Sequence, residues 1–187
     1  MALAALPQFG VLLGVAIIAW CAYHAYNTAI APPSGGALSL ATLKPCFFAT
    51  GGWVGLLYSF LFLQSAASFH ARAQLKKEAT QRGEKPPSFK DVKYSQRGVV
   101  AEAVHAMDRT VGNFLEQSLP LLLGLYLHAV LVSPSGAAAA SWLWLLFRSY
   151  YPLVFNSPVP GVFASTMPAY ACLLYLWGGA LGAATRL

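Results

Sequence analysis

The chain has 187 residues, of which 57% are hydrophobic and only 10% are charged. Soluble domains carry charge on about a quarter of their residues, so this composition excludes an ordinary soluble fold and indicates an integral membrane protein. The net charge of +6 arises mainly in one segment, because eight of the twelve Lys and Arg residues lie between Arg72 and Arg97. A nucleic-acid-binding domain spreads such residues over a folded surface. We therefore expect no nucleic acid partner.

Five apolar segments are long enough to cross a bilayer, since a helix needs about 20 residues to do so. They cover residues 9–31, 45–70, 104–132, 137–155 and 162–184. The connections between them contain Pro and Gly, and the longest is a hydrophilic basic loop that we expect over residues 72–103. The positive-inside rule puts this loop on the cytoplasmic side, or on the matrix or stromal side in an organelle. The last four spans then form an antiparallel helical bundle in contact with membrane lipid.

The first span has two interpretations. Small residues over 27–31 resemble a signal-peptide cleavage point, but no basic residues precede the apolar stretch, as they would in a signal peptide. We favour a retained helix. The predicted organisation is an N-terminal transmembrane helix and linker over residues 1–44, followed by a four-helix bundle over residues 45–187.

The third span carries the most informative polar residues. Arg109, Asn113, Glu116 and Pro120 follow one another at intervals of four, three and four. At 100° per residue they cluster within about 60° on one helix face. Ionisable groups in a membrane helix are costly, so they indicate a functional site.

A second polar face lies on the fourth span, where Arg148, Tyr151 and Phe155 are spaced by three and four. A short connection between antiparallel helices would bring this face near the first. Two interpretations remain open. Arg109 and Glu116 either form a structural ion pair or hold a ligand, and the additional Arg148 favours an anionic ligand.

The segment from Arg109 to Pro120, with its Arg-x3-Asn-x2-Glu-x3-Pro spacing after a basic loop, resembles the signature of the MAPEG family of membrane-associated proteins in eicosanoid and glutathione metabolism. Arg148 and Tyr151 resemble the family's next motif. The resemblance implies an all-α, four-helix transmembrane bundle that forms a homotrimer and binds glutathione between subunits. It implies that Arg109, Asn113, Glu116, Arg148 and Tyr151 contact glutathione, and that the protein lies in the endoplasmic reticulum. An organelle inner membrane is the alternative.

Two departures from the family pattern affect the predicted function. Phe155 stands where the family usually has a tyrosine, and no charged residue lies between Arg148 and Arg186, where the family's synthases place an activating arginine. The resemblance favours a glutathione-dependent transferase or peroxidase acting on lipophilic substrates. The departures and the additional first helix favour a non-catalytic subunit of a larger complex of unlike subunits. We assign no catalytic residue, and the scattered histidines predict no metal site.

Overall fold

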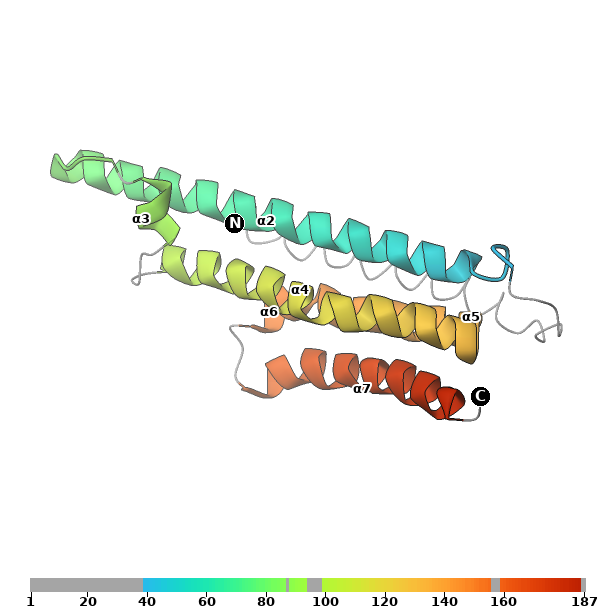
Figure 1. Ribbon diagram of the computed structural model, residues 1–187. Helices are drawn as coiled ribbons and strands as arrows, with labels where there is room; N and C mark the ends of the chain where they lie inside the picture. The colour runs from blue at the N-terminus through green and yellow to red at the C-terminus, as the bar shows by residue number, and fades with distance from the viewer. Residues whose placement is uncertain (1–38, 87, 94–98, 156–158, 186–187) are drawn as a thin grey trace. The chain divides into compact units, whose positions relative to one another are not determined.

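The computed structural model describes residues 39–86, 88–93, 99–155 and 159–185. The described backbone is all-helical apart from turns and connections. The predicted first span and Arg186 lie outside the described residues. Figure 1 labels the helices, which are α2 (Lys44–Arg82), α3 (Phe89–Lys93), α4 (Val99–Leu131), α5 (Pro134–Ser149), α6 (Tyr151–Val154) and α7 (Val159–Ala184).

Three of these helices are long and apolar enough to cross a membrane: α2, residues Glu102–Leu131 of α4, and residues Val162–Ala184 of α7. They coincide with the second, third and fifth predicted spans. An all-α membrane fold is therefore confirmed. The further division of the chain at residue 44 stays a prediction.

The prediction of a single basic loop over residues 72–103 was wrong, because helix covers much of it. Residues 72–82 continue α2 without a break, since Ala, Gln, Leu, Lys, Glu and Arg are strong helix formers whatever their charge. The helix ends at Gly83, whose φ of 70° is in the left-handed region. The N–H of Glu84 donates to the carbonyl of Ala79 at 2.8 Å, and that of Gly83 to Thr80 at 3.3 Å. This pair of bonds is the Schellman termination of a helix.

The expected turn over residues 133–136 is instead the first turn of α5. Ser133 is the N-cap, and its Oγ accepts a hydrogen bond from the backbone N–H of Gly136 at 3.2 Å. Pro134 occupies the first helical position, where a proline loses no hydrogen bond and its fixed φ suits the helix.

The fourth span also ends earlier than predicted, at Ser149 rather than Phe155. Pro152 explains the break, because its ring would clash with the carbonyl of Arg148 in a continuous helix and it has no N–H to donate. Tyr150 interrupts the helix at φ −98° and ψ 3°. The short helix α6 then resumes and carries Tyr151.

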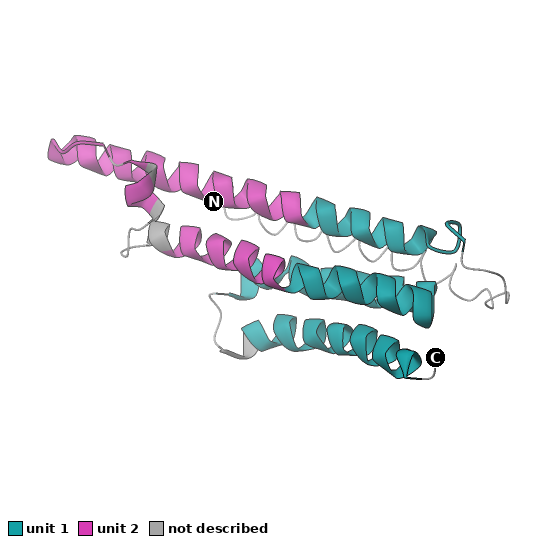
Figure 2. Ribbon diagram, viewed as in Figure 1, with its two compact units in different colours: residues 1–56, 117–187 teal, residues 57–116 magenta. Residues whose placement is uncertain are grey.

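The chain divides into two compact units, shown in teal and magenta in Figure 2. Unit 1 holds the start of α2, the second half of α4 from Gln117, and α5, α6 and α7. Tryptophan indole N–H groups donate hydrogen bonds between its helices, an arrangement that holds membrane helices together where water is absent. These bonds are Trp53 to Ser118 Oγ at 2.8 Å, Trp144 to Gln117 Oε1 at 3.3 Å, and Trp177 to the Pro120 carbonyl at 2.9 Å.

A glycine allows close packing at one point of α2 in unit 1. A Cβ placed on Gly52 would lie 2.5 Å from the Trp142 ring of α5, whereas one on Gly51 would meet nothing within 4 Å. Gly52 therefore accommodates the indole of Trp142.

Unit 2 covers residues 57–116, with the rest of α2, α3 and the first half of α4. The rings of Phe60 and Phe114 meet edge to face with centroids 5.4 Å apart, a favoured aromatic geometry. A second apolar cluster joins the three helices of this unit through Ala71, Leu75, Val92 and Val104.

Candidate functional site

Three residues of the predicted polar face, Arg109, Asn113 and Glu116, lie in the part of α4 that belongs to unit 2, and Pro120 follows in unit 1. Arg109 and Glu116 are exposed, and Asn113 between them is half-buried. Neither Arg109 nor Glu116 forms an ion pair with another described residue; the salt bridge found in that part of the chain joins Arg82 to Glu78 at 3.5 Å. The structural ion pair considered from the sequence is therefore not formed within these residues.

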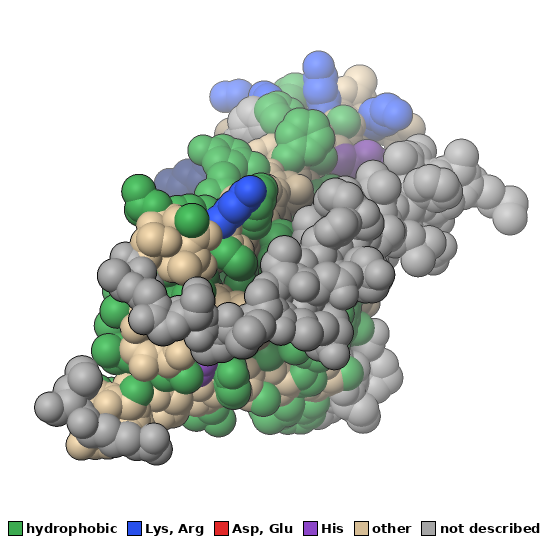
Figure 3. Space-filling view, turned by 90° about the vertical axis from the view of Figure 1, so that its right-hand side faces the viewer, with side chains coloured by type: hydrophobic (Ala, Val, Ile, Leu, Met, Phe, Trp, Pro, Cys, Tyr) green, Lys and Arg blue, Asp and Glu red, His purple; other side chains and the backbone are tan. Residues whose placement is uncertain are grey.

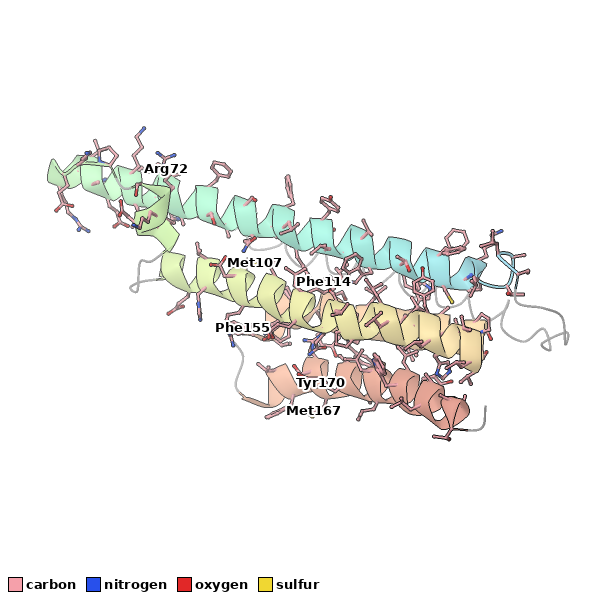
Figure 4. The ribbon with its side chains drawn as sticks, in the orientation of Figure 1. Arg72, Met107, Phe114, Phe155, Met167 and Tyr170 are labelled. Carbon is pink, nitrogen blue, oxygen red and sulfur yellow. The ribbon has the colours of Figure 1, made fainter. Side chains whose placement is uncertain are left out.

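The opposite face of this half of α4 is fixed by packing. Phe114, labelled in Figure 4, is 1% exposed. Thr110 is equally buried and donates from Oγ1 to the Ala106 carbonyl at 2.7 Å. Asp108 accepts a hydrogen bond from Gln64 Nε2 at 2.6 Å. The Gln64–Asp108 bond and the packing of Phe114 against Phe60 join α4 to α2, so they set the rotation of α4 and leave the Arg109 face outward.

Pro120 adds a backbone acceptor to this face. It lies inside α4 and has no N–H, so the carbonyl of Glu116, four residues earlier, lacks its usual helical donor. The carboxylate and the backbone carbonyl of Glu116 are thus two acceptors at one position, which suits a group with several N–H donors such as an ammonium.

Arg148 and Tyr151 are brought together in unit 1, where both are buried with exposed fractions of 2% and 5%. The guanidinium carbon of Arg148 lies 5.7 Å from the centroid of the Trp144 ring and 5.5 Å from that of Tyr151. A cation at this distance from an aromatic face is attracted by the ring quadrupole, and more strongly when both are desolvated. Phe155, labelled in Figure 4, contacts Tyr151 with the ring centroids 5.9 Å apart and the ring planes tilted by 46°.

Hydrogen bonds to α7 fix the end of α5 that carries Arg148. Ser165 Oγ donates to the Phe147 carbonyl at 2.5 Å, and the Tyr150 hydroxyl donates to the Ala164 carbonyl at 2.8 Å. The helix break at Tyr150 turns the chain so that Tyr151, three residues after Arg148, still faces the guanidinium. Packing and backbone hydrogen bonds therefore determine the position of both predicted side chains.

Two buried polar residues of α4, which were not predicted from the sequence, organise unit 1. Gln117 and Ser118 are 8% and 6% exposed, and they accept the indole N–H groups of Trp144 and Trp53. The signal was present, since polar side chains within an apolar span and tryptophans on neighbouring spans predict interhelical hydrogen bonds.

The five predicted site residues thus form two sets. Arg109, Asn113 and Glu116 share a face of α4 in unit 2, and Arg148 and Tyr151 contact each other in unit 1. The role of these residues in binding stays a prediction.

Comparison with known proteins identifies the family. The model of the MAPEG family matches residues 50–182, which is most of the chain and includes all five site residues. No curated protein and no solved structure matches the chain. The match begins in α2 and ends in α7, so it spans the described helices and leaves residues 1–49 outside it. The chain is a member of the MAPEG family.

Proposed function

We propose that this protein binds glutathione and acts as a glutathione-dependent transferase or peroxidase on lipophilic substrates. One observation carries the proposal: the exposed Arg109 and Glu116 lie on one face of α4 and form no ion pair with the described residues. Charged groups in a membrane helix are stable only when a partner or water satisfies them. A zwitterionic, polyanionic ligand would satisfy both.

The chemistry of this face fits glutathione in charge and in length. Glutathione has one ammonium, which matches Glu116, and two carboxylates, one of which matches Arg109. The two residues are seven positions apart, or about 10 Å along the helix. An extended tripeptide also spans about 10 Å, so one molecule reaches both charges while its thiol lies beside Asn113.

Reaction requires the thiolate, because free thiols have a pKa of about 8.5 and only the thiolate is a strong nucleophile. Glutathione supplies this sulfur; attack on an electrophilic carbon forms the S–C bond as the leaving group departs with its electron pair. The chain's own contribution is to bind and orient. We expect Arg148 to act as a positioning residue, since it is buried against Tyr151 rather than open to a ligand.

Glutathione binding by the purified full-length protein in lipid nanodiscs tests the proposal. We expect Glu116→Gln and Arg109→Gln each to weaken binding about tenfold to a hundredfold, as loss of a charge-assisted hydrogen bond does. Glu102→Gln is the matched control, because it makes the same change at an exposed position of the same helix and should leave the affinity unchanged. Equal affinities for all three variants and the wild type would contradict the proposal.

A second candidate function is a non-catalytic subunit of a larger membrane assembly. Phe155 brings no hydroxyl to the ring of Tyr151, and no charged residue follows until Arg186, so groups that could stabilise a thiolate are few. Turnover with a soluble aryl chloride and glutathione separates the two. Conjugation by a homotrimer in the endoplasmic reticulum supports the enzyme. Glutathione binding without conjugation, in a complex with unlike subunits, supports the second function.

A further inference from the structure

A stripe of exposed side chains on α2 changes along the helix from aromatic to basic. Tyr58, Phe62 and Phe69 are 67%, 76% and 62% exposed, and Arg72 and Lys76, also exposed, follow on the same side. Their spacings of four, seven, three and four keep all five within about 80° of the helix circumference. We call these five residues the aromatic-to-basic stripe.

The stripe crosses the boundary between hydrocarbon and headgroups. Phe69 is the last exposed large hydrophobic residue of α2, so the apolar layer ends near it. Arg72 and Lys76 are about 4.5 and 10 Å further along the axis. The headgroup layer of one leaflet is about 5–8 Å thick. Arg72 is therefore at the depth of the lipid phosphates when Phe69 is at the edge of the acyl chains. The backbone of Lys76 is just outside this layer, and its long side chain can reach back to the phosphates.

The neighbouring acid of the helix, Glu78, does not neutralise Lys76 of the stripe. Glu78 already pairs with Arg82, with 3.5 Å between the charged atoms. Among the described residues, Lys76 and its neighbour Lys77 form no ion pair. In Figure 3, several Lys and Arg side chains lie beside hydrophobic ones toward the top of the view. A fixed anion would complement this end of the stripe.

The other side of the same helix segment is covered, which gives the stripe a fixed orientation. Ala71 and Val92 are 1% and 2% exposed, and with Leu75 and Val104 they join α2, α3 and α4 within unit 2. Ala71 is opposite Phe62 and Phe69 on the helix circumference. Arg72, labelled in Figure 4, is thus part of an ordered helix and not of a flexible loop.

We propose that the aromatic-to-basic stripe binds an anionic phospholipid, with the acyl chains against Tyr58, Phe62 and Phe69 and the headgroup phosphate at Arg72 and Lys76. Such a lipid matches the stripe at both ends, because it is apolar where the stripe is aromatic and anionic where the stripe is basic. The site is separate from the Arg109 face proposed for glutathione, since the stripe is on the side of α2 away from Phe60 and Gln64, which contact α4.

The test is the selective retention of phosphatidylserine by the full-length protein. The protein is reconstituted in nanodiscs of phosphatidylcholine with phosphatidylserine, extracted in detergent, and the two co-purified lipids are measured by mass spectrometry. We expect phosphatidylserine to be enriched over its share of the nanodisc. Lys76→Gln should reduce this enrichment about fivefold, the effect of removing one cation at a membrane surface. Lys76→Arg should preserve it.

Lys77→Gln is the matched control, because it removes the same charge from an adjacent exposed residue that points about 100° away from Lys76. We expect it to change the enrichment less than about twofold, since screening limits the reach of an exposed charge. Equal losses of enrichment in Lys76→Gln and Lys77→Gln would indicate diffuse electrostatic attraction and overturn the proposal. An absence of enrichment in the wild type would also overturn it. Displacement of phosphatidylserine by inorganic phosphate would indicate a free-anion site and also overturn it.

Discussion

The two sets of predicted site residues differ in how far the chain itself buries them. Arg148 is 2% exposed and lies against two aromatic rings, whereas Arg109 is exposed and has no ion-pair partner among the described residues. Both are arginines in largely apolar helices. One is held by its own unit, and the other faces outward toward whatever surrounds the chain.

This difference separates stability from binding. A buried cation stacked on rings contributes to folding whether or not a ligand is present. An exposed cation contributes little to folding, and it gains a strong interaction only when an anion arrives. We therefore expect substitution of Arg148 to lower the stability of the fold and substitution of Arg109 to weaken ligand binding. Unit 1 then determines stability, and the outward face of α4 determines binding.

The largest effect is expected from Arg148→Ala. It removes the cation from the rings of Trp144 and Tyr151 and leaves a cavity in unit 1, so the free energy of unfolding should fall by about 2–4 kcal/mol. Thermal unfolding of the purified protein without glutathione measures this. Arg109→Ala should change the stability by less than about 0.5 kcal/mol, as exposed substitutions do. If both variants lose equal stability, the contrast between the two arginines is wrong.

A smaller effect is expected within α7, where two adjacent glycines differ in the same way. A Cβ on Gly179 would lie 2.7 Å from Nδ1 of His128, whereas one on Gly178 would meet nothing within 4 Å. The His128 ring cannot easily move, because it is 1% exposed and its Nδ1 hydrogen-bonds the Leu176 carbonyl at 3.1 Å. Gly179→Ala should therefore destabilise the protein by about 1–3 kcal/mol through overpacking.

Gly178→Ala is the control for that prediction. Alanine favours a helix over glycine by up to about 1 kcal/mol, so this variant should be neutral or slightly more stable in the same thermal unfolding experiment. A destabilised Gly178→Ala with an unaffected Gly179→Ala would show that α7 packs through the other side of the helix.

The sequence could predict which residues share the polar face of α4 but not whether that face is exposed. The spacing of Arg109, Asn113 and Glu116 is a property of any helix, so their common face followed from the residues alone. Which way that face points depends on packing partners distant in sequence, such as Phe60 against Phe114. Nor could spacing show that Arg148 would be buried between rings.

The fold shows the same limit. Long apolar runs identified α2, α4 and α7 correctly, because hydrophobicity alone decides whether a helix can cross a membrane. Charge was a poor guide beyond the membrane, where residues 72–82 form helix despite their Lys and Arg content. The helix-forming composition of that stretch and the Gly83 that ends it were visible in the sequence. Pro152 was equally visible, and its position predicts the break after α5.

The smallest effect concerns α3, whose exposed cap contrasts with its buried Val92. The hydroxyl of Ser88, and after it the Ser88 backbone N–H, donate to the Asp91 carboxylate at 2.7 Å each. These bonds lower the pKa of the Asp91 carboxyl below its usual value. A carboxyl with a lowered folded-state pKa stabilises the fold above its unfolded pKa, about 3.9, and loses that contribution as the pH falls through the folded-state pKa.

The ratio of the wild-type amide exchange rate in α3 to that of Asp91→Asn should therefore be constant from neutral pH down to about pH 4. Below that pH the wild-type rate should rise toward the variant's rate. The comparison at each pH removes the intrinsic pH dependence of exchange. Asparagine at this position cannot titrate, so its α3 should show no such transition. If the exchange rate of α3 changes below pH 4 in both proteins, other groups cause the acid sensitivity. If it changes in neither, the packing of Val92 against Ala71 and Val104 holds α3 without its cap.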